Sequence, residues 1–296
     1  MKSPKFKRSK INYINYNFLI PALILIFVFF LVPNILNFIY PFTDWNTFKT
    51  ELNFVGLRNF IELTIEKTLW RDLLTTFKYA IFVTIVSNIL GLAIALALEK
   101  TSKINGIYRT LFFIPLTIAP LAAGYLFKGI FDTDGTLNYI LSIITNRDIN
   151  FQWLGKINIV IFMVGLVQVW KWLGLRMIIY IAGLNAIPKE LIEAAKVEGS
   201  NFWQILKNIQ IPLIGPSLTF NITMSFVTSL FVFDTVVSMT RGGPARASEV
   251  ANLFILYKFG EGRFSYATTM SLILFLIICV VSIPLITFFR KRELEL

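Results

Sequence analysis

The chain has 296 residues, of which 56% are hydrophobic and 15% are charged, and its formal net charge at pH 7 is +11. This composition is too apolar for an ordinary water-soluble domain. With no His and one Cys, Cys279, the sequence excludes an internal disulfide, a multi-Cys metal site and His-based acid–base catalysis, and we expect no cofactor.

Six apolar runs are long enough to cross the hydrocarbon core of a bilayer as helices. The first, "NFLIPALILIFVFFLVPNILNFIY", begins at Asn17. The others cover residues 76–98, 111–130, 157–184, 211–237 and 264–289. The sequence therefore predicts an all-α polytopic membrane protein with six transmembrane helices over residues 17–296, preceded by an N-terminal tail, residues 1–16.

Basic residues are distributed unevenly between the two sets of connections. The termini and the loops at 99–110 and 185–210 hold 14 Lys and Arg in about 61 residues, whereas the opposite loops hold 10 in about 87. Because an excess of Lys and Arg marks the cytoplasmic side, we predict that both termini are cytoplasmic. The positive charge then reflects topology and contact with membrane lipid, and we expect no nucleic-acid partner.

A charged segment, "IPKELIEAAKVEGSNFWQILKNIQIP", separates the fourth and fifth predicted spans. Pro188 suits the first position of a helix, and Gly199 suits a left-handed stop after that helix. Asn201, followed by Gln204 three residues later, is typical of the N-cap of a second helix. We therefore predict two short helices joined at Gly199, after which Pro212 begins the fifth span.

This loop, residues 185–212, has two interpretations. In the first it is an interfacial connector that lies on the bilayer and holds two spans apart. In the second it is a docking site, because Ala194, Ala195 and Gly199 form a small-residue face that another backbone can approach. Glu193 beside that face would then pair with a partner through a charge-assisted hydrogen bond.

The spacing of the segment resembles the EAA loop of the integral-membrane subunits of bacterial ATP-binding-cassette (ABC) importers, E-A-A-x(3)-G-x(9)-I-x-L-P. The matching residues are Glu193, Ala194, Ala195, Gly199, Ile209 and Pro212, with Ile211 in place of Leu. The flanking "AGLNAIPKELIEAAKVEGS" is similar to the carbohydrate branch, the sugar permeases of the maltose and glycerol-phosphate type. Glu198 and Ser200 stand where that branch more often has Asp and Ala.

The resemblance covers most of the chain. "FVGLRNF", "TTFKYA" and "WKWLGLRMIIYIAGL" look like segments around the first, second and fourth helices of that branch. "FDTVVSMTRGGPA" is similar to the turn after the fifth helix, and its "GGPA" points to an F-subunit-like member.

The resemblance implies the type I ABC importer permease fold in a bacterial cell membrane. It implies four kinds of partner: a second permease, two cytoplasmic ATPase subunits, an extracellular sugar-binding protein and membrane lipid. It also assigns Glu193 to an ion pair with an ATPase, Ala194 and Ala195 to close contact, and Gly199 to an elbow. Because the chain contains no G-x-x-x-x-G-K-[ST] motif, we expect it to be no enzyme, with ATP hydrolysis by partner subunits.

Polar and aromatic residues in the fourth and fifth predicted spans are candidates for the path of a sugar, since hydroxyls and amides bond sugar OH groups and aromatic faces stack on sugar rings. Several recur at helical spacing on one face. The alternative is that they join helices to one another. The candidates are Gln168, Trp170, Gly174, Asn221, Ser225, Thr228, Ser229 and Phe231.

Lys171 and Arg176 are costly within a membrane and should face protein or a cavity. We expect them to pair with a carboxylate such as Asp234 or with the partner permease; alternatively, they favour an anionic substrate such as glycerol 3-phosphate. A polyamine permease would show acidic residues along the path, whereas the spans hold four basic groups and one Asp. An intramembrane enzyme would need a catalytic dyad, and a free-standing channel would not need a docking loop.

Overall fold

The computed structural model describes residues 19–49 and 51–291, and this part of the chain is built of helices, with one isolated β-bridge between Thr43 and Phe54. The predicted all-α fold is confirmed. The predicted tail, residues 1–16, lies outside the described residues. Four continuous stretches of helix are long and apolar enough to cross a membrane. They are Ile20–Phe42, made of α1 (Ile20–Ile26), η2 (Phe27–Leu31), α2 (Val32–Ile39) and η3 (Tyr40–Phe42), then α4 (Lys67–Leu98), α8 (Val160–Asn185) and α15 (Phe264–Arg290).

The third predicted span is not one straight helix. It begins earlier than expected, with α5 (Lys103–Phe113) and η4 (Ile114–Thr117), and then turns by 101° into α6 (Pro120–Ile130). The bend follows from Pro120, because the residue before a proline is pushed out of helical geometry. Ala119 has ψ 137° and Ile118 has ψ 133°, both extended.

The fifth predicted span is also bent, and the expected restart at Pro212 is wrong by about one helical turn. The second short helix runs through Pro212 as α10 (Phe202–Ile205), η5 (Leu206–Gln210) and α11 (Ile211–Leu213). The chain turns by 74° only at Ile214, before α12 (Gly215–Leu230). With each bent pair counted as one span, the described residues have the six predicted spans.

Two π-helical turns occur in the described residues, and both end two residues before a proline. Phe27–Leu31 precedes Pro33, and Leu206–Gln210 precedes Pro212. A proline inside a helix has no N–H to donate, and its ring clashes with the carbonyl one turn back. A wider turn before the proline gives that ring room, so both helices continue past the proline without a break.

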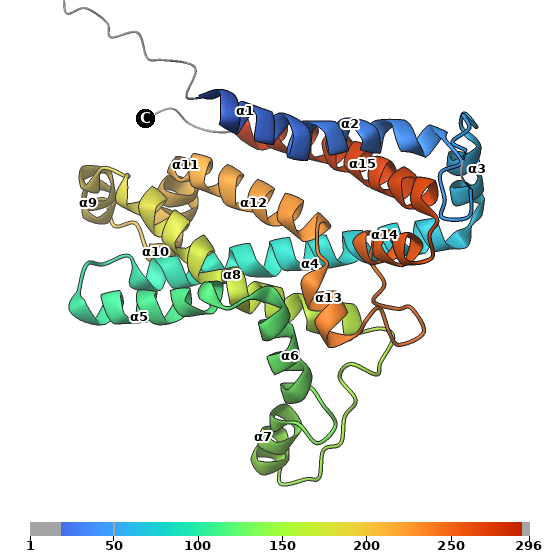
Figure 1. Cartoon of the computed structure of the whole chain (residues 1–296). Helices are drawn as coiled ribbons and strands as arrows, with labels where there is room; N and C mark the ends of the chain where they lie inside the picture. Colours follow the sequence, from blue (N-terminus) through green and yellow to red (C-terminus); the bar gives the residue numbers. More distant parts are fainter. Residues whose placement is uncertain (1–18, 50, 292–296) are drawn as a thin grey trace, which may run out of the picture.

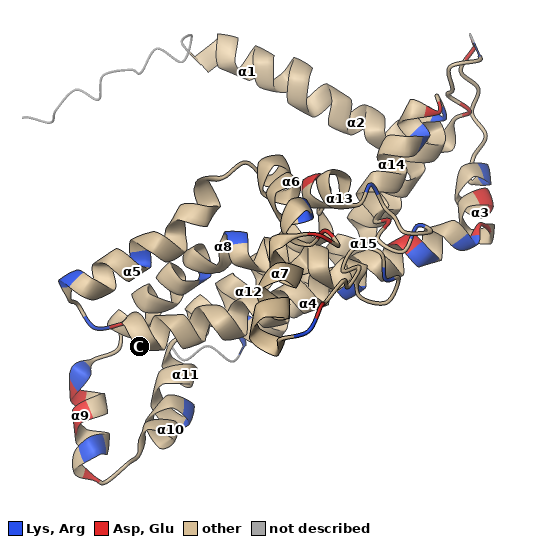
Figure 2. Ribbon diagram, turned by 90° about the horizontal axis from the view of Figure 1, so that it is seen from below, with Lys and Arg blue, Asp and Glu red and all other residues tan. Residues whose placement is uncertain are grey.

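α4 and α8 lie side by side at the centre of the bundle (Figure 1). Glycines bring them close: a Cβ added to Gly91 of α4 would lie 2.8 Å from Arg176, and one added to Gly165 of α8 would lie 2.8 Å from Phe82. α12 packs against α4 and α15, and the last part of the first span, α2 and η3, contacts α15, whereas Figure 2 shows α1 lying away from the bundle. The most apolar part of that first span is 0% buried, so its surface is left for lipid or another subunit.

The remaining helices are short and lie at the ends or on the side of the bundle. They are α3 (Arg58–Ile65), α7 (Thr136–Thr145), α9 (Lys189–Val197), α13 (Asp234–Met239) and α14 (Ala251–Gly260). We call the two ends of the bundle the α9 end and the α14 end. Figure 1 shows that α1 begins and α15 finishes at the α9 end, whereas α3 lies at the α14 end. Figure 2 shows that α9 has both acidic and basic residues, while the spans are almost free of charge.

Candidate coupling site and solute path

α9 begins after a proline and ends in a hydrogen-bonded motif at the glycine that its sequence predicts. Pro188 stands at the N-cap, so the helix begins at Lys189, one residue later than predicted. At the other end Gly199 has φ +83°, its N–H donates to the Lys196 carbonyl at 3.0 Å, and the Ser200 N–H donates to the Ala195 carbonyl at 2.9 Å. These two bonds form a Schellman motif, so Gly199 ends the helix as predicted.

The second helix of the segment begins with the predicted capping box. The Gln204 backbone N–H donates to Asn201 Oδ1 at 3.0 Å, and the Asn201 backbone N–H donates to Gln204 Oε1 at 2.7 Å. Two backbone donors that a helix start leaves without partners are satisfied in this way. The α9–α11 segment is therefore two capped helices with a Gly elbow between them.

α9 has two different faces. Ile192 and Ala195 lie toward the chain, and Ala195 is 8% exposed. Glu193 and Ala194 lie on the opposite, free face, and they are exposed. Glu193 has no ion pair among the described residues.

The remaining predicted coupling residues lie on the second helix or at its ends. Gly199 is exposed, whereas Ile209 and Pro212 are half-buried. Sequence reasoning missed two apolar side chains on this surface. Val197, one turn after Glu193, is 90% exposed, and Trp203 is 72% exposed. The signal for Val197 was its spacing of four from Glu193, which places both on one face.

A buried hydrogen-bond network joins α4, α8 and α12. The Tyr180 hydroxyl donates to Asn88 Oδ1 at 2.6 Å, and Asn88 Nδ2 donates to Ser225 Oγ at 2.8 Å. Asn221 Nδ2 donates to the Arg176 carbonyl at 3.2 Å. Asn221, Ser225 and Ser229 lie in the interior of the chain, all at 1% exposure or less. In this structure two of the three candidates, Asn221 and Ser225, bond to other helices.

The other path candidates are divided between packing and surface positions. Gly174 is a packing residue, since a Cβ there would lie 2.2 Å from the Phe112 carbonyl oxygen. Trp170 is half-buried and packs edge-on against Phe127, with ring centroids 4.9 Å apart. Gln168 and Thr228 are also half-buried, and Phe231, which caps α12, is 53% exposed.

Lys171 and Arg176 are buried, at 5% and 3% exposure. Lys171 Nζ donates to the Leu116 carbonyl at 3.0 Å, and Arg176 Nη1 lies 3.5 Å from Asn221 Oδ1. Neither forms an ion pair with any described residue, so the expected pairing with a carboxylate such as Asp234 is wrong within this chain, and pairing with a partner permease stays a prediction. Lys171 instead satisfies a carbonyl at the bend between η4 and α6. Arg176 Nε has no hydrogen-bond partner in the described part of the chain.

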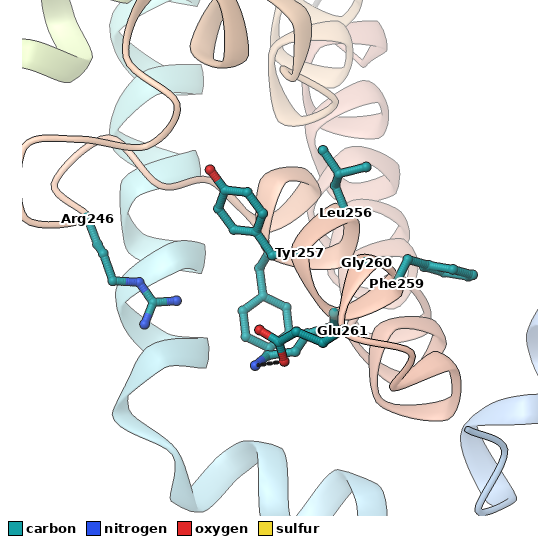
Figure 3. A pocket seen from close by; sticks show the side chains of 8 residues that line it. Arg246, Leu256, Tyr257, Phe259, Gly260 and Glu261 are labelled. Carbon is teal, nitrogen blue, oxygen red and sulfur yellow. Dashed lines mark hydrogen bonds and ion pairs between the residues drawn. The ribbon is translucent and has the colours of Figure 1, made fainter. Parts of the chain in front are cut away.

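A cavity of about 660 Å³ lies at the α14 end. Figure 3 shows Arg246 on a loop at one side of it and Tyr257 and Glu261, from α14 and its end, at the other. Arg246 Nη2 donates to Glu249 Oε1 at 2.7 Å, and this bond raises the pKa of Arg246. Lys258 Nζ donates to Glu261 Oε2 at 2.8 Å. The cavity therefore combines aromatic surface with charges of both signs.

The fold and this site define a polytopic helical membrane permease, and comparisons with known proteins give its family. Residues 87–293 match the binding-protein-dependent transport system inner membrane component family. The chain is similar to the probable starch degradation products transport system permease protein AmyD of Thermoanaerobacterium thermosulfurigenes, 31% identical over 100% of this chain and 99% of the relative. It is also similar to the multiple sugar-binding transport system permease protein MsmF of Streptococcus mutans, 29% identical over 95% and 97%.

The chain belongs to the binding-protein-dependent transport system inner membrane component family, and it is the membrane-spanning permease subunit of an ABC importer. The predicted family is thereby confirmed. The fold is shared with a chain of the crystal structure of a bacterial ABC transporter involved in the import of alginate, an acidic polysaccharide. Its TM-score is 0.79 at 20% identity, with 93% of this chain and 94% of that chain covered.

Proposed function

We propose that this chain forms the translocation pathway of a sugar importer together with a second permease, and that two ATPase subunits drive it through the α9–α11 segment. The observation that carries the proposal is the free face of α9. Glu193 and Val197 stand exposed on a helix that begins after Pro188 and ends in a Schellman motif at Gly199, so a partner would meet an ordered, partly apolar surface with one charge. Such a surface suits docking better than a flexible connector does.

Sugar as the solute rests on the relatives, whose names describe starch degradation products and multiple sugars. The α9 end would lie in the cytoplasm with both termini, since the connections on that side have the higher density of Lys and Arg. Residues 17–296 would then be the permease domain, with residues 1–16 as a cytoplasmic tail. An extracellular sugar-binding protein would deliver the solute at the opposite end.

The cavity shown in Figure 3 is the proposed docking place for that binding protein. It lies at the α14 end, away from α9, and its Tyr257 and Arg246 are residue types enriched at protein interfaces. The solute path would use the candidates whose side chains are partly open, namely Gln168, Trp170, Thr228 and Phe231. The remaining candidates would shape that path by holding α4, α8 and α12 in place; they are Gly174, Asn221, Ser225 and Ser229.

A second candidate solute, an anionic sugar such as a sugar phosphate, is favoured by the two buried cations. Lys171 and Arg176 have no carboxylate partner among the described residues, so positive charge remains inside the spans. The same charge disfavours a polyamine.

ATP-dependent uptake by the purified complex in proteoliposomes tests the proposal. Uptake of labelled maltodextrin, with competition by neutral sugars and by sugar phosphates, distinguishes the two solute classes. Glu193→Arg should leave the chain inserted but separate it from the ATPase. Glu51→Arg is the same charge reversal on an exposed residue of the loop that leads into α3, the helix at the α14 end, and this variant should still co-purify with the ATPase. Uptake that needs neither ATPase nor ATP would overturn the proposal.

A further inference from the structure

A second cavity lies at the α9 end, between the end of α4 and the α9–α11 segment. Its volume is about 460 Å³, which is within the range of small-molecule sites. Leu96 of α4 and Ile205 of α10 contribute to an apolar wall, and Lys100 and Lys196 contribute positive charge. The position matters because the cavity touches both a span and the segment that the proposed function assigns to the ATPase.

The Gln210 side chain also lines this cavity and lacks a partner. The residue is 5% exposed, and its Oε1 is buried without a hydrogen bond among the described residues. Gln210 is the last residue of the π-helical turn η5. A buried acceptor is costly to leave unpaired, so the site favours a ligand with a hydroxyl or amine donor.

The charges around the cavity favour an anion. Lys100 and Lys196 are exposed and form no ion pair with any residue that the structure describes. Lys196 also lies in the last turn of α9. The one acidic residue of the lining, Glu99, is partly buried, and desolvation raises its pKa although the two lysines oppose that effect. The balance of charge is therefore positive.

We propose that this cavity binds a phosphate ester that also has hydroxyl groups, with the phosphate between Lys100 and Lys196 and a hydroxyl donating to Gln210 Oε1 once that side chain turns its buried oxygen toward the cavity. Two sources have this chemistry: the headgroup of phosphatidylglycerol in the membrane, and a soluble polyol phosphate. Because the lining comes from both α4 and the α9–α11 segment, a bound ligand ties the segment to the span. Its occupancy would then regulate how far α9 moves relative to α4.

The test measures binding directly on the full-length chain purified with its partner subunits. One arm counts phosphatidylglycerol molecules retained from nanodiscs by native mass spectrometry, with phosphatidylcholine nanodiscs as the reference. The other arm measures binding of sn-glycerol 3-phosphate by calorimetry. The double variant Lys100→Gln, Lys196→Gln should weaken binding about 25-fold, because each Lys near a membrane surface contributes about fivefold in affinity. Gln210→Leu, which removes only the hydrogen-bonding group, should weaken it about fivefold.

Lys189→Gln is the matched control, because it removes the same charge from the same helix at a position outside the cavity lining. Retention of phosphatidylglycerol alone identifies the lipid as the ligand, and binding of glycerol phosphate alone identifies a soluble one. Either result supports the proposal if the cavity variants lose binding while Lys189→Gln retains it. Equal binding by all variants, or no binding of either probe, overturns the proposal. Neither result depends on which solute the importer transports.

Discussion

Substitution of Gly199 should uncouple the permease in a graded series. Gly199 connects the two helices of the α9–α11 segment with φ +83°, a conformation that L-residues rarely adopt. We expect Gly199→Asn to be tolerated best, Gly199→Ala to be intermediate and Gly199→Val to be worst. Asn adopts the left-handed conformation more readily than other residues, whereas a β-branched side chain is an outlier there.

The magnitude follows from the surroundings of the glycine. A Cβ at Gly199 would meet nothing within 4 Å, so no steric clash with another part of the chain contributes. The cost is the intrinsic penalty of the left-handed conformation, about 1–2 kcal/mol for a residue with a Cβ. That range shifts the equilibrium between the formed and the opened elbow by about 5- to 30-fold. Val adds the restriction of its branched side chain to this cost.

The assay compares ATP hydrolysis and solute uptake by the reconstituted complex. An opened elbow leaves the free face of α9 intact but no longer holds it rigidly. If that face docks the ATPase as proposed, hydrolysis should persist while uptake per ATP falls. Gly106→Val is the matched control, because Gly106 lies inside α5 and a Cβ there also meets nothing within 4 Å. Normal uptake per ATP by Gly199→Val, or an equal loss by Gly106→Val, would refute the role of the elbow.

Four further predictions follow from single residues. Glu193→Arg should keep the melting temperature, because this exposed residue has no ion pair in the described chain. It should nevertheless abolish co-purification of the ATPase. A complex that survives would contradict the proposal that the free face of α9 binds the ATPase. Gly174→Ala should lower the melting temperature, because the added Cβ would lie 2.2 Å from the Phe112 carbonyl oxygen. Gly129→Ala should leave it unchanged, because a Cβ there meets nothing within 4 Å. Equal melting temperatures of the two variants would exclude the close approach of Gly174 to Phe112. Arg176→Met should keep or raise the melting temperature, because it removes a buried charge that has no counter-ion in the described residues. The same variant should reduce uptake. A large fall in the melting temperature would mean that Arg176 has a structural role instead. Glu99→Gln should raise the free energy of unfolding at about pH 8 and leave it unchanged at about pH 4. The reason is that the pKa of Glu99 is raised in the folded state, so ionisation of this carboxyl opposes folding. A gain in stability confined to low pH would contradict this raised pKa.

The spans were predictable because the hydrophobic runs extend over whole helices, and four of the six are continuous as expected. The two bent pairs were missed because hydropathy averages over a window and does not register where a helix breaks. The local signals were present in both cases. Pro120 disfavours helical geometry in the residue before it, and Ala119 is extended. Gly215 is followed by Pro216, a pair that favours the start of a new helix over continuation.

The two helices of the α9–α11 segment were predictable because their signals are local. An N-cap side chain and a left-handed glycine act within one turn of the helix, so Asn201 and Gly199 could be assigned without knowledge of the rest of the fold. The solute path depends on which helices pack together, and one sequence does not contain that information. Helical spacing placed Asn221 and Ser225 on one face, but only the structure shows that α4 and α8 cover it. The expected pairing of Arg176 with Asp234 failed for the same reason.

The packing where the α9–α11 segment meets α8 and α12 indicates which helices a displacement of α9 would move. Ile214, at the 74° bend between α11 and α12, is 1% exposed, so the corner is held in the interior rather than free to flex. Close by, a Cβ on Gly183 of α8 would lie 2.3 Å from Ser217 Oγ of α12, so the two spans that flank the segment are in direct contact. A force on α9 therefore acts on α8 and α12 together, and the bonds of Asn88 extend that contact to α4. A displacement of α9 would therefore move α8, α12 and α4 together, which fits a permease whose helices turn as a unit around the solute.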